Sequence, residues 1–460
     1  MKHTSFRQSV RHALGPIAPL IPDRLRFGNK YVKMAALLRK SESFDVTGLQ
    51  QIQLFKLQDL LRHCWKNVPY YQESWKSRGI EIKNIVKLDD LQNFPFLTKK
   101  LIQENINKLK ATNIPDRRKV LVTTGGSSGE PTQLYRHVND NLETAFIADL
   151  WARVGCSLET RRMVLRGPIL LSDKKWHWDL SDRTLTCSTY HFDDEHMQCY
   201  FNLLGYYRIE AIHGHVSSVA TFAQFLIRNG LRYKLKAVLG ASERVFEFQR
   251  ELVKQAFDCR LFSWYGQTEQ VVLAGEGISS QEYLIYPQYG VTELIDSFGK
   301  VITSPGKPGE IVGTGFNIYS MPLIRYRTGD IGVYSEEHYE SGEPIYKKFK
   351  YIDGRSYEYV VLQDGVLVSL TGLIFGQHFA CFERIIKMQL VQDFPGFLQI
   401  FIVADKRFNQ EDENEIIQII DRATDGRIKL TFNYVDNIRL TAQGKHRFLI
   451  QNISNKLTSA

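Results

Sequence analysis

Hydrophobic positions near the start of the chain recur with the period of an α-helix. Between residues 46 and 67 they fall at Leu54, Leu57, Leu61, Cys64 and Trp65. This spacing places the apolar side chains on one face of a helix that packs against a core. Phe55 and Leu60 widen the apolar stripe, so we expect the helix to be well buried. The proline in the next segment, NVPYY at residues 67–71, breaks this helix.

Beyond residue 118, short apolar runs alternate with amphipathic stretches. The runs predict strands, and they lie at residues 163–166, 210–212, 237–239 and 260–264. The stretches predict helices, of which the clearest are 217–229 and 244–257. Strands that alternate with helices are typical of an α/β layer fold. Residues 283–334 are richer in strands, with glycine and proline turns between them.

The pattern changes again near residue 354. A strand at 398–404, a helix at 409–424 and a strand at 429–434 indicate a separate small α+β domain. The length of 460 residues also exceeds the roughly 250–300 residues that one core supports. We therefore expect three parts. They are a basic leader at 1–45, a large α/β domain with a β-rich subdomain at 46–353, and a small mobile α+β domain at 354–460.

A run of glycines and hydroxyl residues, TTGGSSGEPT at residues 123–132, separates two strand-like segments. Its glycines let the backbone turn sharply and approach a ligand without a Cβ in the way. Consecutive backbone N–H groups, with the hydroxyls of Thr124, Ser127, Ser128 and Thr132, make a concavity that suits phosphate oxygens. The run is not a P-loop, because Glu130 stands where that motif has lysine. An exposed hairpin turn is the alternative that the run alone leaves open.

Three constellations further along the chain supply other parts of a nucleotide site. The strand at 260–264 runs into YGQTE, where Tyr265 could stack on a base, Thr268 donate to phosphate and Glu269 bind Mg²⁺. Asp330, beside a glycine in YRTGD, could accept two ribose hydroxyls. For these two acids the alternatives are a surface carboxylate and a turn aspartate. Lys445, in GKHR near the C-terminus, could supply a cation to the site. The alternative is a solvent-exposed lysine that only keeps a terminal tail soluble.

Composition narrows the class of protein. A hydrophobic fraction of 43% and a charged fraction of 24% are ordinary for a globular chain in water. No apolar run approaches the roughly 20 residues that cross a bilayer, so we expect no transmembrane helix. Residues 1–13 are polar and basic without an apolar centre, which predicts that there is no signal peptide. We expect a cytoplasmic protein.

Nearly all of the net charge of +9 lies at the N-terminal end. Residues 1–40 hold nine lysines and arginines against one acid, Asp23. Such a leader could rest peripherally on an anionic membrane surface, or it could dock as a solvated tail on its own domain. The rest of the chain is close to neutral and has no recognisable nucleic-acid-reading module, so we expect no nucleic-acid partner.

The six cysteines are scattered without a C-x-x-C pair, which argues against a disulfide framework. One cluster could hold zinc, because Cys187, His191, His196 and Cys199 lie within thirteen residues. Zinc spacings usually begin with a tight pair, and the acids between these residues indicate a loop. A zinc site therefore stays an open alternative.

The order TGGSSGEPT, YGQTE, YRTGD, GR and GK resembles the signature series of the adenylate-forming superfamily. That superfamily includes acyl-CoA synthetases, peptide-synthetase adenylation domains and luciferases. The chain is more similar to one branch, the phenylacetate–CoA ligases and the CapK-type capsular polysaccharide biosynthesis proteins. HCWKNVPYY at 63–71 and LDDLQNFPFLTK at 88–99 carry this closer resemblance. The resemblance covers nearly all of residues 46–455.

The resemblance implies an ATP site assembled from four motifs. The phosphate loop would hold the β- and γ-phosphates through Thr124, Gly126, Ser127, Ser128 and Gly129. A second segment would lie along the adenine, and it consists of Ala241, Ser242 and Glu243. Tyr265 and Gly266 would pack on the base, and Asp330 would take the ribose hydroxyls with Arg355 beside it.

The resemblance also implies the catalytic groups. Thr268 would touch phosphate and Glu269 would bind Mg²⁺. Lys445 would arrive from the C-terminal domain and bridge the carboxylate and the α-phosphate. Coenzyme A would be a possible second cofactor.

Three features depart from the pattern of the branch. Tyr357 stands two residues past the Gly-Arg pair, where an acidic or lysine hinge is usual, and this bears on the domain rotation that the second half-reaction needs. Glu130 replaces the more frequent lysine of the phosphate loop. His213 or His215 could gate the acyl pocket where the branch commonly has Pro-Ser, although a structural histidine is the alternative.

The predicted activity is ATP-dependent, AMP-forming activation of a small-molecule carboxylate. An acyl-adenylate would form, and its acyl group would pass to coenzyme A, a carrier-protein thiol, or a sugar amine or hydroxyl. The CapK-type resemblance favours a cell-envelope or capsular polysaccharide pathway. Two alternatives stay open: an AMP transferase that acts on a hydroxyl acceptor, and a non-catalytic nucleotide-binding scaffold of an envelope assembly.

Overall fold

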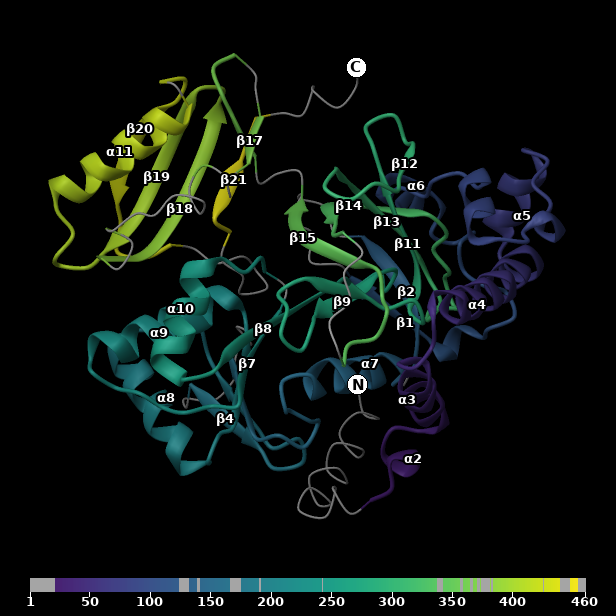
Figure 1. The fold of residues 1–460 in the computed structure, drawn as a ribbon, viewed down its shortest axis with the longest axis horizontal. Coiled ribbons are helices and arrows are strands. Elements are labelled where there is room, and N and C mark those ends of the chain that lie inside the picture. Colours follow the sequence, from purple (N-terminus) through teal and green to yellow (C-terminus); the bar gives the residue numbers. More distant parts are fainter. Residues whose placement is uncertain are drawn as a thin grey trace. The chain divides into compact units, whose positions relative to one another are not determined.

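The computed structural model describes most of the chain in two compact units (Figure 1). The described residues are 21–123, 132–138, 141–165, 175–189, 192–241, 243–336, 342–355, 359–364, 367–369, 373, 381, 384–424, 426–438 and 447–453. Unit 1 consists of residues 1–159 and 262–354. Unit 2 consists of residues 160–261 and 355–460. Each unit therefore combines two segments that are far apart in the sequence, and the predicted domain boundaries stay a prediction.

The helices of unit 1 precede most of its strands. They are α2 (Asp23–Arg26), α3 (Asn29–Ser41), α4 (Val46–Asn67), α5 (Pro69–Lys76), α6 (Lys99–Asn105) and α7 (Leu142–Ala152). Short 3₁₀ turns lie between them at η2 (Ile82–Asn84), η3 (Leu88–Asn93) and η4 (Asp116–Arg118). The Asp45 side chain caps α4 by accepting a hydrogen bond of 2.8 Å from the Gly48 amide.

Helix α4 confirms the helix predicted from its apolar spacing, except that two residues of the predicted stripe, Phe55 and Trp65, are exposed. Leu57, Leu60, Leu61 and Cys64 are completely buried. Phe55 was expected to widen the buried stripe, and this is wrong because its side chain is 68% exposed. At 100° per residue, position 55 lies about 160° from position 57 around the helix, on the solvent side. Its hydrophobicity does not outweigh that angular position.

The strands of unit 1 form a hairpin and the β-rich part of the fold. In the hairpin, β1 (Lys119–Thr123) pairs antiparallel with β2 (Gln133–His137), and Thr123 lies opposite Gln133. Eight further strands follow in the spatial order β12 (Val301–Ile302), β11 (Gly290–Ile295), β13 (Pro308–Gly315), β14 (Tyr326–Tyr334), β15 (Lys348–Arg355), β10 (Tyr283–Ile285), β9 (Leu273–Glu276) and most of β8 (Arg260–Gly266). Both the strands that flank the glycine run and the strand-rich stretch after residue 283 are confirmed.

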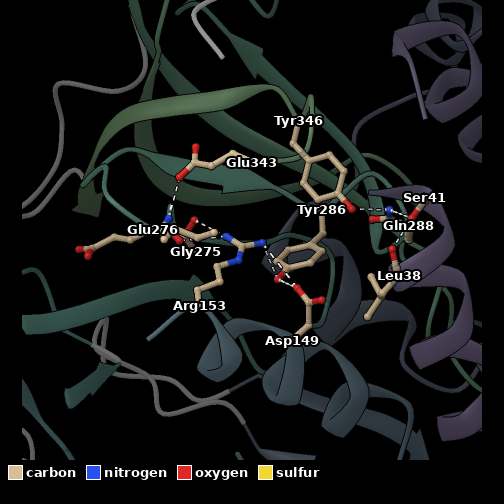
Figure 2. A network of polar contacts seen from close by, with 11 residues as sticks. Leu38, Ser41, Asp149, Arg153, Gly275, Glu276, Tyr286, Gln288, Glu343 and Tyr346 are labelled. Carbon is tan, nitrogen blue, oxygen red and sulfur yellow. Dashed lines mark hydrogen bonds and ion pairs between the residues drawn. The ribbon is translucent and has the colours of Figure 1, made fainter. Parts of the chain in front are cut away.

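The segment 23–41 packs on the body of unit 1. Helix α3 buries Tyr31, Met34, Leu38 and Ser41, which share one face, and it packs against α7. Ser41 also enters a network of polar contacts that Figure 2 shows. There Gln288 donates to the Ser41 hydroxyl at 2.6 Å and to the Tyr346 hydroxyl at 2.7 Å. This stretch therefore docks on its own domain, while contact of its outer side with a membrane stays a prediction.

The same network holds α7 against strands β9 and β10 (Figure 2). Arg153, at the end of α7, donates to the Glu276 carbonyl at 2.9 Å and to the Tyr286 hydroxyl at 2.7 Å. Tyr286 in turn donates to the Asp149 carboxylate. Because these groups are buried and bonded to one another, they fix the helix in one position on the sheet.

The first segment of unit 2 is a parallel sheet with helices packed on it. The strand order is β7 (Ala237–Ala241), β6 (Ala211–Gly214), β3 (Arg162–Leu165), β5 (Thr184–Cys187) and β4 (Trp176–Asp179). Only β4 within this group runs antiparallel, at the edge. The helices are α8 (Asp194–Tyr206), α9 (Val216–Arg228) and α10 (Glu247–Phe257), and their apolar side chains share one core with the strands. The predicted alternation of strands and helices is confirmed.

The C-terminal segment forms a small α+β structure with its own core. Its sheet has the order β20 (Lys429–Tyr434), β19 (Phe397–Ala404), β18 (Ile385–Phe394) and β21 (Leu449–Gln451), with helix α11 (Gln410–Thr424). A second pair consists of β16 (Tyr359–Val361) and β17 (Leu367–Ser369). The α/β fold class with a small α+β C-terminal domain is therefore confirmed. Among the described helices, none combines the length and hydropathy that a bilayer span requires.

Candidate nucleotide site

Two of the predicted motifs, YGQTE and YRTGD, meet in unit 1 through hydrogen bonds. Tyr265, near the end of β8, donates from its hydroxyl to Oδ2 of Asp330 on β14 at 2.6 Å. The Asp330 amide donates to the Thr328 hydroxyl at 3.1 Å, which holds the turn around Gly329. Burial of the Tyr265 hydroxyl, and next the charge of Asp330, raises the pKa of Tyr265 well above its usual value. The phenol therefore stays protonated and keeps the carboxylate oriented.

Glu269 lies in the same turn and is 7% exposed. The Tyr326 hydroxyl donates to Oε1 of Glu269 at 3.1 Å. Tyr326 begins β14, so the strand that carries Asp330 also positions Glu269. The predicted base-stacking, ribose-binding and Mg²⁺-binding side chains thus belong to one connected group.

The hairpin that carries the glycine run is tied to this group. Arg136 on β2 donates from Nη2 to the backbone carbonyl of Thr268. Gln270, which follows Glu269, donates to the carboxylate of Glu143 at the start of α7. The same carboxylate accepts a hydrogen bond from the Tyr289 hydroxyl at 3.1 Å. Strand β2, which flanks the predicted phosphate loop, is therefore held to the YGQTE turn by the part-buried contact of Arg136, and the turn is held to α7 through Glu143.

Arg325, one residue before the YRTGD motif, is a buried clamp with 3% exposure. Its Nε and Nη2 donate to the two carboxylate oxygens of Glu293 at 2.9 and 2.8 Å. Its Nη1 donates to the carbonyls of Gln92 and Phe94 at 2.9 and 2.8 Å. Its backbone is left-handed, with φ of 51°, which is uncommon outside glycine and costs free energy that these bonds offset.

The two branch-specific segments pack against the chain just before this motif. His63 contacts the Tyr319 carbonyl through Nε2 at 2.9 Å. The Tyr71 hydroxyl donates to the Pro322 carbonyl at 2.9 Å and accepts from the Ile324 amide at 3.1 Å. Leu97 exchanges backbone hydrogen bonds with Arg325 and Arg327. The segments 63–71 and 88–99 therefore support the strand that carries Asp330.

The predicted adenine-side segment lies in unit 2. Ala241 ends β7 and is buried. The Glu243 carboxylate accepts from the Ser217 amide at 2.8 Å and from the Ser217 hydroxyl at 3.0 Å. This places a negative charge at the N-terminus of α9, where the helix dipole favours it. The side chain of Glu243 is thus engaged within its own unit.

Other predicted residues fall outside the described part of the chain. They are Thr124, Gly126, Ser127, Ser128, Gly129, Glu130, Ser242, Tyr357 and Lys445. Arg355 ends β15, and only its backbone is described. His213 lies on β6 and His215 is the residue that precedes α9. The roles of all these residues stay predictions.

The described residues contain no cluster of three or more His, Cys, Asp and Glu side chains that could hold a metal ion. Of the four residues considered for zinc, His191 is outside the described part. Cys187 is buried in β5, and His196 contacts the Asp193 carboxylate through Nδ1 at 2.7 Å. For Mg²⁺ the requirement is different, since this ion typically takes one or two carboxylates with substrate phosphates and water. Glu269, an oxygen donor beside the hydroxyl of Thr268, fits that requirement.

Sequence reasoning assigned no role to four residues that organise the site: Arg136, Glu143, Arg325 and Tyr326. Tyr326 and Arg325 lie in or beside the YRTGD motif, so their position was a usable signal. Arg136 and Glu143 gave none, because a single cation on a strand and a single acid at a helix start are common on surfaces. Their partners become evident only once β2, α7 and the YGQTE turn are in place.

Comparison with known proteins agrees with the motif order. The CapK C-terminal domain family matches residues 362–452. Protein CapK of Staphylococcus aureus is 23% identical over 423 residues, which cover 89% of this chain and 90% of that protein. Phenylacetate-coenzyme A ligase of Pseudomonas putida is 25% identical over 307 residues, which cover 64% of this chain and 69% of the ligase.

A solved structure shares the fold along most of the chain. It is 2-hydroxyisobutyryl-CoA ligase in the postadenylation state, with a TM-score of 0.70 at 14% sequence identity, covering 90% of this chain and 91% of that one. The same ligase in an open conformation gives a TM-score of 0.56 at 16% identity, covering 87% of this chain and 91% of that one. Together with the two relatives, the matched domain family and the motif order, this fold confirms the resemblance. The chain is similar in sequence to CapK-type proteins and phenylacetate–CoA ligases, and it shares the fold of an adenylate-forming CoA ligase.

Proposed function

We propose that this protein uses ATP to activate a small-molecule carboxylate as an acyl-adenylate and then passes the acyl group to an acceptor. The observation that carries the proposal is the connected group in unit 1. Tyr265 is bonded to Asp330 at 2.6 Å, and Glu269 is held by Tyr326 at 3.1 Å in the same turn. These contacts support the proposal because they join the side chains that we propose stack on the base, bind the ribose and hold Mg²⁺.

The first half-reaction needs orientation and charge neutralisation more than acid–base chemistry. A carboxylate oxygen attacks the α-phosphorus, the bond to the bridging oxygen breaks, and pyrophosphate leaves with the electron pair. Since the attacking group is already an anion, no side chain has to remove a proton. Asp330 would orient the ribose, Thr268 would donate to phosphate, and Lys445 would bridge the carboxylate and the α-phosphate.

Glu269 would hold Mg²⁺, which when bound neutralises charge on the phosphates. The Tyr326 hydroxyl orients Glu269 for this role. The backbone amides and hydroxyls at Thr124, Gly126, Ser127, Ser128 and Gly129 would bind the outer phosphates. Gly266, Ala241, Ser242, Glu243 and Arg355 would complete the nucleotide site.

The acceptor is proposed by class. Coenzyme A is the first choice, because relatives and structural neighbours are named as CoA ligases. A carrier-protein thiol, or a sugar amine or hydroxyl in a cell-envelope or capsular polysaccharide pathway, follows from the similarity to Protein CapK. The proposed location is the cytoplasm, with the possibility of peripheral contact at the membrane surface.

Exchange of labelled pyrophosphate into ATP, measured across a panel of carboxylates, tests the first half-reaction. We expect at least one acid to support exchange, and Lys445→Ala to reduce it about a hundredfold or more, as is usual for loss of a well-placed charge. Lys406→Ala, an exposed lysine in the same segment, is the matched control and should leave exchange unchanged.

Two other outcomes would replace the proposal. If ATP binds but no acid supports exchange, the ligase assignment fails and a nucleotide-binding scaffold is the better account. If AMP appears on a hydroxyl acceptor without an added acid, the protein is an AMP transferase. The second half-reaction is tested separately by adding coenzyme A after the adenylate has formed and measuring the thioester.

A further inference from the structure

The exposed face of α3 has an unusual composition for a helix that is docked on its other side. Tyr31, Met34, Leu38 and Ser41 point into unit 1. The outward side carries Lys30, Lys33, Arg39 and Lys40, all exposed, with Val32 between them at 38% exposure. We call Val32, Lys33, Arg39 and Lys40 the basic face.

No acidic residue occurs within α3, whose sequence is NKYVKMAALLRKS. The acids that flank it lie outside the helix, at Asp23 before it and at Glu42 and Asp45 after it. Arg26 is not part of the basic face, because it is paired with Glu159 at 2.5 Å and its side chain is only 17% exposed. Lys33, Arg39 and Lys40 therefore form a patch of one sign on α3.

The basic face is held rigidly, in contrast to a solvated tail. The end of α3 is anchored by Gln288, which donates to Ser41 at 2.6 Å in the network of Figure 2. The Ser41 hydroxyl in turn donates to the Leu38 carbonyl at 3.0 Å. A fixed row of cations meets a flat charged surface without losing much chain entropy, which a flexible segment would lose.

An apolar side chain interrupts the cations. Val32 is 38% exposed and lies on the outer side of α3 with Lys33 and Arg39. A single exposed apolar residue is ordinary, but this one borders cations. Cations that border exposed aliphatic side chains suit the headgroup region of a bilayer, where the aliphatic groups enter the acyl boundary and the cations stay with phosphate. Nucleic acid would use the cations but not the aliphatic side chains.

We propose that the basic face binds the surface of an anionic bilayer and holds unit 1 peripherally on it. In the sequence, residues 1–20 also contain three basic residues, Lys2, Arg7 and Arg11, and no acid. Each basic side chain near an anionic surface contributes about 1 kcal/mol, so the three cations of the basic face give a useful but reversible attraction. The proposal is independent of the ligase reaction and would stand or fall without it.

Vesicle co-sedimentation with the full-length protein tests this inference. Vesicles of phosphatidylcholine with phosphatidylglycerol are compared with vesicles of phosphatidylcholine alone, at about 50 and 300 mM salt. We expect binding to the anionic vesicles only, with clear weakening at the higher salt concentration because exposed charges are screened. Binding to both kinds of vesicle alike, or to neither, would overturn the proposal.

Paired charge reversals identify the face. The double variant Lys33→Glu/Lys40→Glu should lose at least tenfold in partition, while Lys300→Glu/Lys307→Glu, with the same change in net charge at other exposed positions of unit 1, should keep most of it. Lys33→Gln/Lys40→Gln should lose an intermediate amount of binding. This milder variant, together with thermal unfolding, checks that the loss does not come from misfolding. Equal losses in the two reversal variants would show that only net charge matters and would overturn the assignment to α3.

A variant that lacks residues 1–20 completes the test. We expect the truncated protein to bind anionic vesicles measurably, and more strongly than Lys33→Glu/Lys40→Glu does. If its removal abolishes binding while the α3 reversals have no effect, the surface lies in that segment and not on the basic face. If the basic face binds an RNA or an acidic protein and the protein does not bind vesicles, the proposal is likewise overturned.

Discussion

Replacing Glu293 with glutamine should destabilise unit 1 strongly, although the side chain keeps its shape. Glu293 accepts two hydrogen bonds from Arg325, at 2.9 and 2.8 Å, and both side chains are less than 10% exposed. The substitution removes the only carboxylate that Arg325 contacts in the described residues and leaves a buried guanidinium without its counter-charge. The two remaining carbonyl partners, Gln92 and Phe94, are neutral dipoles.

The expected cost follows from the asymmetry of buried ion pairs. Breaking such a pair by removing one partner typically costs about 3–5 kcal/mol, because the other charge stays buried. We take roughly 3 kcal/mol here, since two carbonyls still accept from Arg325. For a unit of this size that corresponds to a fall in Tm of about 5–10 °C. Replacing both partners together by leucine at 293 and methionine at 325 should restore most of the loss.

Thermal unfolding of the wild type, Glu293→Gln and the double replacement measures these values directly. Glu73→Gln is the matched control, because Glu73 pairs with Lys108 at 2.7 Å while both side chains are more than half exposed. Such an exposed pair contributes less than about 1 kcal/mol. If Glu293→Gln and Glu73→Gln shift Tm equally, burial of the Arg325 charge does not hold this part of the fold, and the clamp described above is refuted.

Three further substitutions test other contacts. Tyr326→Phe removes the hydrogen bond to Glu269 and should raise the Mg²⁺ concentration for half-maximal ATP binding about three- to tenfold, as titration calorimetry would show; an unchanged requirement would contradict the positioning role. Burial lowers the pKa of Lys56 to about 8, so between pH 8 and 10.5 the unfolded state binds more protons and stability rises with pH. The free energy of unfolding, measured with urea, should therefore rise by about 2 kcal/mol more in the wild type than in Lys56→Met between pH 7.5 and 9.5. If the difference between the two proteins stays constant over this pH range, the lowered pKa of Lys56 is contradicted. Glu243→Gln weakens the charged contact with Ser217 at the start of α9 and should cost about 1 kcal/mol in urea unfolding, whereas no loss would mean that the helix is capped by other groups.

Elements with strong periodicity could be predicted from the sequence, and their errors have a geometric cause. Helix α4 was expected from its apolar spacing, and Leu57 and Leu60 are buried as predicted. Phe55 was misplaced because hydrophobicity was weighed above its angle around the helix. The strands that flank the glycine run were also expected, since a short apolar run on each side of a turn predicts a hairpin.

The contacts that join the motifs could not be predicted in the same way. Tyr265 and Asp330 are 65 residues apart in sequence, and their hydrogen bond depends on how β8 and β14 are placed in one sheet. Glu243 was expected beside a nucleotide, and its carboxylate accepts a hydrogen bond from Ser217 because the end of β7 lies near the start of α9. The left-handed backbone of Arg325 has no local signal, since arginine rarely adopts it.

The division of each unit into two separated chain segments has a consequence for synthesis on the ribosome. Helix α4 and the first hairpin share their core with Val291, Leu294 and Ile311, which belong to the second segment of unit 1. At about 5–20 residues per second, residues 160–354 emerge over roughly 10–40 s after the first segment is complete. For that time α4 can pack against α5, η2 and η3 but lacks its partners from the second segment, so part of its apolar stripe is open to other proteins that bind hydrophobic segments. The order of translation, and not only the final stability, therefore determines how much of this protein reaches its native state.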